Sequence, residues 1–222
     1  MITQEGRISS PPAREAEQRL EELLEEFDLW AASADRSDAG WESDFPQWRE
    51  LMRQAEQIMA VKTQNEHSLF LLGRCWAISE ENETCAYWAR EHLEDAYAKH
   101  LVQQLTGSTE RDTRWQAYDV LSDLPVLDSK TRNILETGIA DTDAYVRRRA
   151  FSALLRHSEI DTQPYVIQML TDSDIYNRYV GVKEAIHLGS ETLHNQVQAA
   201  LQDPAVTELY DYYLNHKELI DN

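Results

Sequence analysis

Residues 141–155, DTDAYVRRRAFSALL, constrain the fold of this chain more than any other stretch. An aspartate at position 141 or 143 can accept hydrogen bonds from the unpaired N–H groups at the start of a helix. The apolar residues that follow recur at helical spacing, and they are Val146, Ala150, Ala153 and Leu154. Because two of them are alanines, a neighbouring helix can approach closely. The stretch therefore predicts an amphipathic helix packed tightly against another helix.

The same pattern recurs along the second half of the chain. Its arginines fall in one column, 33 and 31 residues apart, at Arg114, Arg147 and Arg178. Three residues after each arginine stands a small residue, namely Ala117, Ala150 and Gly181. A weaker fourth copy begins at Asp203, with Thr207 in the arginine column and Tyr210 in the small-residue column. The spacing predicts two-helix solenoid repeats, and the departure in the last copy is typical of a terminal capping repeat.

Residues 141–155 resemble the HEAT-repeat family, in its PBS-lyase-like form. The resemblance rests on the capping aspartate, the Val-Arg pair, the two spaced alanines and the leucine. The resemblance covers residues 92–222 and implies an all-α fold, an α-α superhelix built from antiparallel helix pairs. The pairs are expected at 92–106 with 110–123, 128–140 with 143–157, 161–171 with 174–188, and 191–202 with 205–219 as the cap. Proteins of this family mostly bind other macromolecules along an extended face, so the resemblance implies a binding function.

The first part of the chain shows no HEAT motif, but its apolar residues keep a helical period. After a polar lead at 1–10, the sequence predicts an N-terminal helical region at 11–91 that continues the stack. Helices are expected at 13–32, 46–62 and 66–78, with a polar loop at 33–45 that holds Trp41 either exposed or as an anchor. Asn82 is expected to cap a further helix that either runs unbroken to Leu105 or bends before it.

The chain is strongly acidic, with 21 Lys and Arg against 40 Asp and Glu and a formal charge of −19. This balance argues against unspecific attraction to nucleic acid or to an anionic membrane. The densest acidic face is expected on the first helix, at Glu21, Glu22, Glu25 and Glu26. Two interpretations of it are open, a solvated surface or a face that attracts a basic protein partner.

The two cysteines, Cys75 and Cys85, are too few for a disulfide framework and lack the paired spacing of a zinc site. They are interpreted as reduced core residues, which favours a reducing compartment. The first residues lack the apolar run of a signal peptide, and no later stretch is apolar enough to span a bilayer. We therefore expect a cytoplasmic protein that binds no membrane.

In a stack of repeats, equivalent positions lie side by side and form stripes on one surface. The positions one, five and nine residues after the aligned arginines hold Trp115, Arg148 and Tyr179, then Asp119, Ser152 and Lys183, then Asp123, Arg156 and His187. This mixture of aromatic and charged groups suits a protein partner. We expect partner contacts from this stripe, from Arg149, and from the acidic face of the first helix. The arginines of the run 147–149 have a second interpretation, as ion pairs with the surrounding acids.

His187, Glu191 and His194 have a spacing that is found in some helical metal sites. Gly189 and Ser190 lie between them and are expected to end the helix, which separates the three side chains. The sequence contains no nucleophile elbow, no phosphate-binding glycine loop and no Ser-His-Asp signature. We therefore expect no metal, no cofactor and no catalytic residue.

These observations favour a non-enzymatic protein-binding solenoid. Its small size and negative charge suggest an inhibitor or immunity protein that captures a cationic effector such as a nuclease toxin. The resemblance also implies an alternative, because some HEAT-like proteins are similar to alkylpurine DNA glycosylases or to phycobilin lyase subunits. In a glycosylase the centre of the DNA-binding face would correspond to Trp115, Asp119, Arg148 and Tyr179. The net charge argues against that alternative, since a DNA-binding enzyme must neutralise phosphates.

Overall fold

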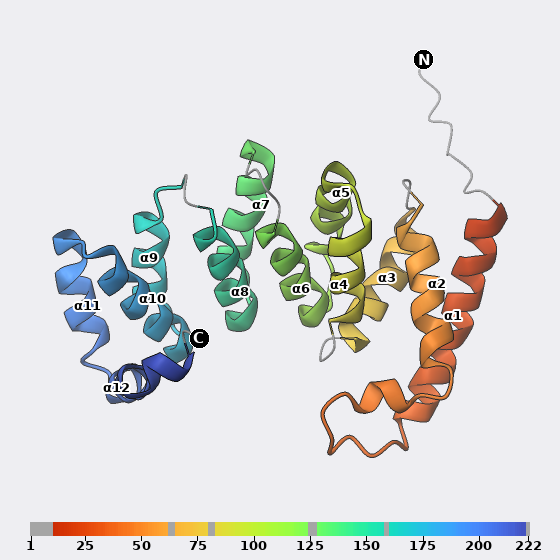
Figure 1. The fold of residues 1–222 in the computed structure, drawn as a ribbon, viewed down its shortest axis with the longest axis horizontal. Coiled ribbons are helices and arrows are strands. Elements are labelled where there is room, and N and C mark those ends of the chain that lie inside the picture. Colours follow the sequence, from red (N-terminus) through yellow and green to blue (C-terminus); the bar gives the residue numbers. More distant parts are fainter. Residues whose placement is uncertain (1–10, 62–64, 80–82, 124–127, 158–159, 221–222) are drawn as a thin grey trace. The chain divides into compact units, whose positions relative to one another are not determined.

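The structure is a computed structural model that describes residues 11–61, 65–79, 83–123, 128–157 and 160–220. These residues are all-α, as the sequence predicts, and contain no strand. Figure 1 shows the helices in chain order: α1 (Pro11–Ala31), η1 (Trp41–Asp44), α2 (Trp48–Met59), α3 (Glu66–Ile78), α4 (Thr84–His92), α5 (Asp95–Leu105), α6 (Arg111–Ser122), α7 (Ser129–Ile139), α8 (Ala144–Leu155), α9 (Gln163–Leu170), α10 (Ile175–Leu188), η2 (Glu191–Leu193), α11 (His194–Ala200) and α12 (Pro204–Ile220). None of the described helices is both long and apolar enough to cross a membrane.

The chain forms two compact units, an N-terminal unit of residues 1–134 and a C-terminal unit of residues 135–222. The division between them falls within α7. Inside each unit the helices pack mainly against helices that are close in the sequence, which is the arrangement of a helical solenoid. Each unit is described separately below.

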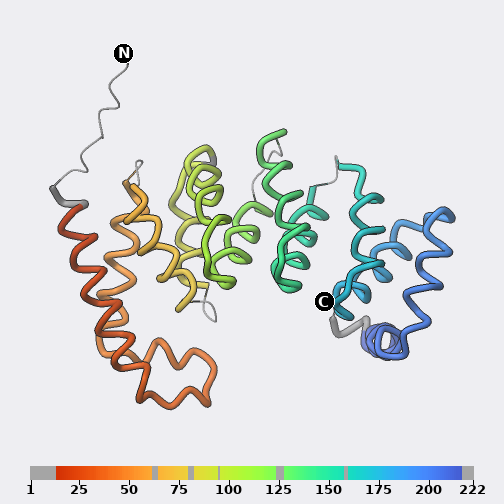
Figure 2. The backbone as a smooth tube through the Cα atoms, turned by 180° about the vertical axis from the view of Figure 1, so that it is seen from behind, coloured from red at the N-terminus to blue at the C-terminus, as the bar shows by residue number. Residues whose placement is uncertain are grey.

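In the N-terminal unit, α1 and α2 lie side by side in opposite directions, and α3 packs against both (Figure 2). Helix α6 contacts α3, α4 and α5, so it is covered from three sides. All its residues from Trp115 to Ser122 are consequently buried. The core between α1, α2 and α3 is built from side chains such as Leu24, Leu51, Leu72 and Trp76.

The loop between α1 and α2 is held by aromatic contacts at one end of that helix pair (Figure 1). Trp41 stacks on Trp30 with ring centroids 5.6 Å apart, and it lies 5.9 Å from Phe27. The Arg36 guanidinium sits 4.7 Å from the Trp41 ring centroid, while its Nε and Nη2 donate to the carbonyl of Ala31. Trp41 is therefore an anchor of the loop, one of the two interpretations of the sequence.

The segment that precedes Leu105 bends rather than running as one helix. Helix α4 ends at His92, Leu93 and Glu94 have extended backbone angles, and α5 begins at Asp95. Asn82, which the sequence predicts as the cap of the first of these helices, lies outside the described residues.

In the C-terminal unit, α9 and α10 form the tightest pair, and α8, α11 and α12 also pack against α10. Gly181 explains how α9 and α10 approach so closely. A Cβ at this position would lie 2.7 Å from the backbone nitrogen of Leu170 and 3.0 Å from the carbonyl carbon of Met169. Close packing of α9 against α10 thus requires a very small residue at this position of the small-residue column.

The last two helices differ from the expected antiparallel pair. Helix α12 crosses α11 steeply, as Figures 1 and 2 both show, and packs on α10. Only residues 201–203 connect α11 to α12, which begins at Pro204. Because of this crossing, the tyrosines of α12 meet the side chains of α10.

The arginine column of the sequence corresponds to a repeated local geometry. Each arginine donates through Nη1 to the backbone carbonyls six and five residues before it, at 2.8–3.1 Å: Arg114 to Ser108 and Thr109, Arg147 to Asp141 and Thr142, and Arg178 to Asp172 and Ser173. The last copy keeps the first of these contacts, because the Thr207 hydroxyl donates to the carbonyl six residues before it at 2.8 Å. The arginines at 147 and 178 also bind an aspartate 25 residues further on, Asp172 and Asp203 respectively.

Candidate partner-binding cleft

Helix α10 presents three of the predicted partner-binding residues, Tyr179, Lys183 and His187, at intervals of four residues. The Asp174 side chain caps this helix by accepting from the backbone N–H of Asn177 at 3.0 Å. An interval of four places side chains on one face of a helix, so these three residues share a face of α10. Two of them, Lys183 and His187, line the cleft described below, and Tyr179 packs against the ring of Tyr213.

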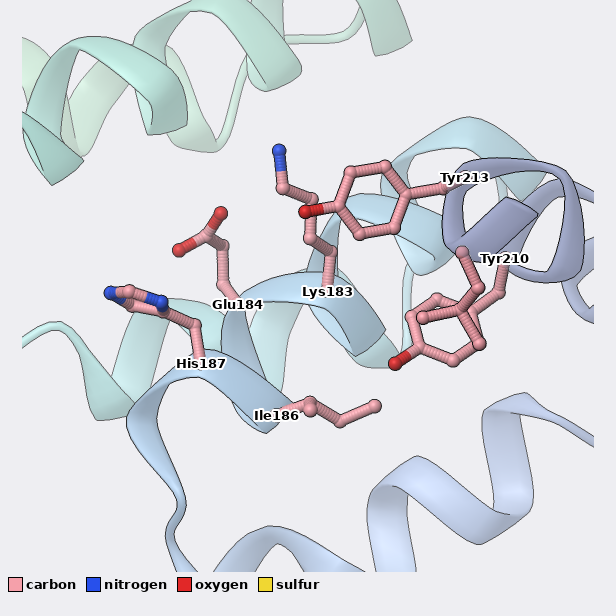
Figure 3. Close-up of a pocket in the computed structure, with 7 residues that line it drawn as sticks. Lys183, Glu184, Ile186, His187, Tyr210 and Tyr213 are labelled. Atoms are coloured by element: carbon pink, nitrogen blue, oxygen red, sulfur yellow. The ribbon is translucent and has the colours of Figure 1, made fainter. Parts of the chain in front are cut away.

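The opposite wall comes from α12, and the two helices enclose a cleft of about 600 Å³ (Figure 3). Its lining residues are Lys183, Glu184, Ile186 and His187 of α10 with Tyr210, Tyr213 and Leu214 of α12. The steep crossing of α12 brings its tyrosines over α10, which repeat periodicity alone does not reveal. The signal in the sequence is the tyrosine-rich run 210–213 in a helix that follows the last clear repeat.

Tyr213 forms the aromatic centre of the cleft. Its ring is largely buried, packs edge-on against Tyr179 at 6.4 Å and lies 6.3 Å from the ring of Tyr210. The Lys183 ammonium stands 4.9 Å from the centroid of the same ring, a cation–π contact. Figure 3 shows the Lys183 ammonium and the Tyr213 hydroxyl extending to the same side. A ligand there meets a cation and a hydroxyl that aromatic packing holds in place.

The rim of the cleft combines apolar and ionisable side chains. Ile186 and Leu214 are each about half exposed although they are large apolar residues. Glu184 and His187 lie on the other side of α10 from Tyr210, as Figure 3 shows. The cleft can therefore cover apolar groups of a ligand and also accept or donate hydrogen bonds at its edge.

The arginines of α8 do not line this cleft. Arg148 lies between the rings of Tyr145 and Tyr176, with its guanidinium carbon 5.1 Å and 5.5 Å from their centroids. Its Nη1 also donates to the Asn177 side chain at 3.1 Å and pairs with Asp174 at 3.4 Å. Arg148 is thus held by α8 and α10 themselves, as the ion-pair interpretation of the arginine run expects.

The two other arginines of the predicted set differ from each other. Arg149 is half-buried, and its guanidinium carbon lies 5.9 Å from the ring centroid of Tyr145. Arg156 is the C-cap residue of α8 and is exposed. Neither of them lines the α10–α12 cleft.

Trp115 and Asp119 were expected on an exposed stripe, and the structure corrects this. Trp115 is only 5% exposed, and its Nε1 donates to Asp112 at 3.3 Å. Asp119 is buried and pairs with Arg90 at 3.7 Å. The reason is that α4 also packs against α6, where its Arg90 meets Asp119, whereas the equivalent positions of α8 and α10 are only half-buried.

The acidic face of α1 is partly neutralised by neighbouring side chains. Arg19 contacts Glu22 at 3.1 Å and Glu26 at 3.5 Å. Hydrogen bonds from Arg19 and then from Gln18 lower the pKa of Glu22. His67 lies 3.6 Å from Glu21, while Glu25 is exposed. These carboxylates therefore form a weaker negative surface than their number suggests.

The helix break predicted between His187 and His194 is confirmed. Gly189 has a φ of +59°, a left-handed conformation that ends α10 at Leu188, and η2 begins at Glu191. Within the described residues no three His, Cys, Asp or Glu side chains are grouped as metal ligands.

Comparison with known proteins gives this chain no family. No protein-family model matches it, and neither a curated protein nor a solved structure is significantly similar. The resemblance to HEAT repeats therefore stays a prediction.

Proposed function

We propose that this protein is a non-enzymatic binding protein of the HEAT-repeat type, which holds a segment of a protein partner in the α10–α12 cleft. The observation that carries the proposal is the composition of the cleft. Half-exposed Ile186 and Leu214 flank an aromatic centre that carries the Lys183 ammonium. Aromatic residues surrounded by apolar and polar groups are the usual make-up of the energetically important part of a protein interface.

Helices α10 and α12 expose further large apolar or aromatic residues outside the cleft, which favours a macromolecular partner over a small ligand. Leu188 follows the cleft residue His187 and is 44% exposed, and Tyr212 precedes Tyr213 and is 61% exposed. Large apolar side chains that gather on a surface commonly mark protein interaction sites.

The charge of the chain supports a more specific version, in which the partner is a cationic effector and this protein its inhibitor. A formal charge of −19 attracts a basic protein over a distance of several ångströms and accelerates association. The captured effector would be neutralised because the solenoid covers part of its surface. A nuclease toxin is one effector of this kind, and the protein would then act as its immunity protein.

Affinity capture with three forms of the full chain tests the proposal. The wild type is compared with Leu214→Glu, which places a charge in the cleft, and with Leu29→Glu, the same change at a leucine of α1 that is 78% exposed. Captures from the native host are made at low and moderate salt, and bound proteins are identified by mass spectrometry.

We expect one dominant protein to be retained by the wild type and by Leu29→Glu, and to be lost by about tenfold or more with Leu214→Glu. Equal retention by both variants would refute binding in the cleft. A basic partner whose capture weakens as salt rises, and whose activity the purified chain inhibits, supports the inhibitor version. A neutral partner insensitive to salt contradicts that version alone.

A further inference from the structure

A second groove lies in the N-terminal unit, between α3 and the connection from α5 to α6. It has a volume of about 250 Å³. Its lining comes from Glu66, Leu69, Phe70 and Arg74 of α3, from Gln104 and Leu105 at the end of α5, and from residues 107–110. Every one of these residues belongs to the N-terminal unit, so this groove is separate from the α10–α12 cleft.

The apolar side of the groove is dominated by Phe70. This ring is 60% exposed, although α3 buries its neighbours Leu71 and Leu72 completely or nearly so. Leu69 is half-buried and Leu105 is buried, and they supply the apolar surface beside the ring. Exposure of a phenylalanine ring to water is unfavourable, and a ligand side chain that packs on the ring would remove this apolar surface from water.

The floor of the groove is held rigidly. A Cβ on Gly73 would meet the Ser108 hydroxyl oxygen at 3.2 Å, so α3 and the α5–α6 connection are in close contact there. The Thr113 hydroxyl donates to the carbonyl of Gly73. The Arg114 guanidinium fixes the carbonyls of Ser108 and Thr109 at 3.1 Å each. A preformed surface of this kind loses little conformational entropy when a ligand binds.

The charge of the groove is negative. Its one lining cation, Arg74, is already neutralised, because its Nη2 donates to both carboxylate oxygens of Asp28 at 2.6 Å and 2.8 Å. Glu66 and Glu110 are both exposed carboxylates at the rim. Glu110 occupies the N-cap position of α6, yet its side chain makes no capping hydrogen bond there. Two carboxylates thus face the solvent beside the exposed ring.

We propose that this groove is a docking site for a basic segment of a protein partner, in which an apolar side chain packs on Phe70 and flanking Lys or Arg side chains meet Glu66 and Glu110. Charge complementarity selects this occupant, since an acidic segment would be repelled by both carboxylates. The inference rests on the proposed function only in that the chain binds proteins. It specifies the partner's chemistry and does not depend on the α10–α12 cleft.

The test uses the full chain and a short fluorescein-labelled peptide with a central phenylalanine flanked on both sides by lysines. A second peptide carries glutamates in place of the lysines. Fluorescence anisotropy gives the dissociation constant of each at about 50 mM and about 500 mM NaCl, where screening lengths differ about threefold. The groove variants are Phe70→Ala and the pair Glu66→Gln with Glu110→Gln. The matched control is Tyr87→Ala, because Tyr87 lies in the same unit and is 61% exposed.

We expect the lysine peptide to bind the wild type and Tyr87→Ala alike, and to bind Phe70→Ala about tenfold more weakly. The double glutamine variant should also bind more weakly, and its binding should depend less on salt than that of the wild type. Equal binding of both peptides, or equal affinities for Phe70→Ala and the wild type, would overturn the proposal. Leu214→Glu should leave the affinity for the lysine peptide unchanged. A wrong assignment of this groove can therefore be distinguished from a wrong assignment of the α10–α12 cleft.

Discussion

The ion pair between Arg147 and Asp172 gives the sharpest prediction of stability. The Asp172 carboxylate accepts from Arg147 Nε and Nη2 at 2.7 Å each, from the Asp174 backbone N–H at 2.8 Å and from the Asn177 side chain at 3.2 Å. Its side chain is only 5% exposed, and that of Arg147 is 13% exposed. Burial raises the pKa of Asp172, but the hydrogen bonds from Arg147, Asp174 and Asn177 outweigh it and lower the pKa from 3.8 to about 2.

The replacement Asp172→Asn removes the charge while it keeps the size of the side chain. Lowering the pKa from 3.8 to about 2 corresponds to about 2–3 kcal/mol of unfolding free energy, since one pKa unit is worth about 1.4 kcal/mol. Because the pKa is lower in the folded state, this stabilisation is complete above the unfolded pKa. It is lost as the pH falls through the folded value. The variant should therefore be about 2–3 kcal/mol less stable than the wild type at pH 7, and this deficit should shrink between about pH 4 and pH 2.

Urea unfolding followed by two signals measures this effect. All six tryptophans lie before residue 135, so their fluorescence reports the N-terminal unit, while far-ultraviolet circular dichroism reports the helices of both units. The matched control is Asp203→Asn at the equivalent pair with Arg178, where the aspartate side chain is 35% exposed. It should destabilise the protein less than Asp172→Asn does. Equal stabilities of Asp172→Asn and the wild type at pH 7, or a deficit that persists unchanged at pH 2, would refute the reasoning.

Three further predictions follow from packing, thiol burial and charge. Gly181→Ala should destabilise the C-terminal unit by about 1–3 kcal/mol in urea unfolding, because the Cβ of the alanine would lie 2.7 Å from the backbone nitrogen of Leu170. A stability equal to that of the wild type would contradict this contact. Burial raises the pKa of the Cys75 thiol well above its usual value and that of Cys85 to about 12. Both thiols should therefore react with Ellman's reagent at pH 8 only as the protein unfolds. Rapid reaction of the native protein would contradict their burial. The net charge of −19 predicts no binding to duplex DNA at low salt in a mobility-shift assay, and measurable binding would revive the glycosylase-like alternative.

The repeat geometry was largely predictable from the sequence because it depends on local spacing. Each arginine of the column at 114, 147 and 178 donates to backbone carbonyls five and six residues before it. This contact depends only on the conformation of the preceding turn, so a recurring sequence pattern is enough to predict it. The close approach at Gly181 follows from its lack of a side chain. The end of α10 was likewise predictable from Gly189, which adopts a left-handed conformation.

The candidate sites were only partly predictable because they depend on how helices cross. Trp115 and Tyr179 occupy the same repeat position, yet Trp115 is buried, whereas Tyr179 is half-buried and packs against the cleft residue Tyr213. The cleft wall formed by Tyr210, Tyr213 and Leu214 depends on the steep crossing of α12, which the helical period does not encode. Phe70, the main apolar residue of the second groove, lies outside the predicted repeats, where no column drew attention to it.

The paired arginines and aspartates of the C-terminal unit also have a mechanical consequence. Arg147 binds the carboxylate of Asp172, while Arg178 donates to the backbone carbonyl of the same aspartate and pairs with the carboxylate of Asp203. The links are thus arranged in series along the chain. Tension applied at the C-terminus loads the Arg178–Asp203 link first, and this is the link more open to water. Under an optical trap, the unit should then lengthen in discrete steps that begin at α12, with the Arg147–Asp172 link as the last to yield.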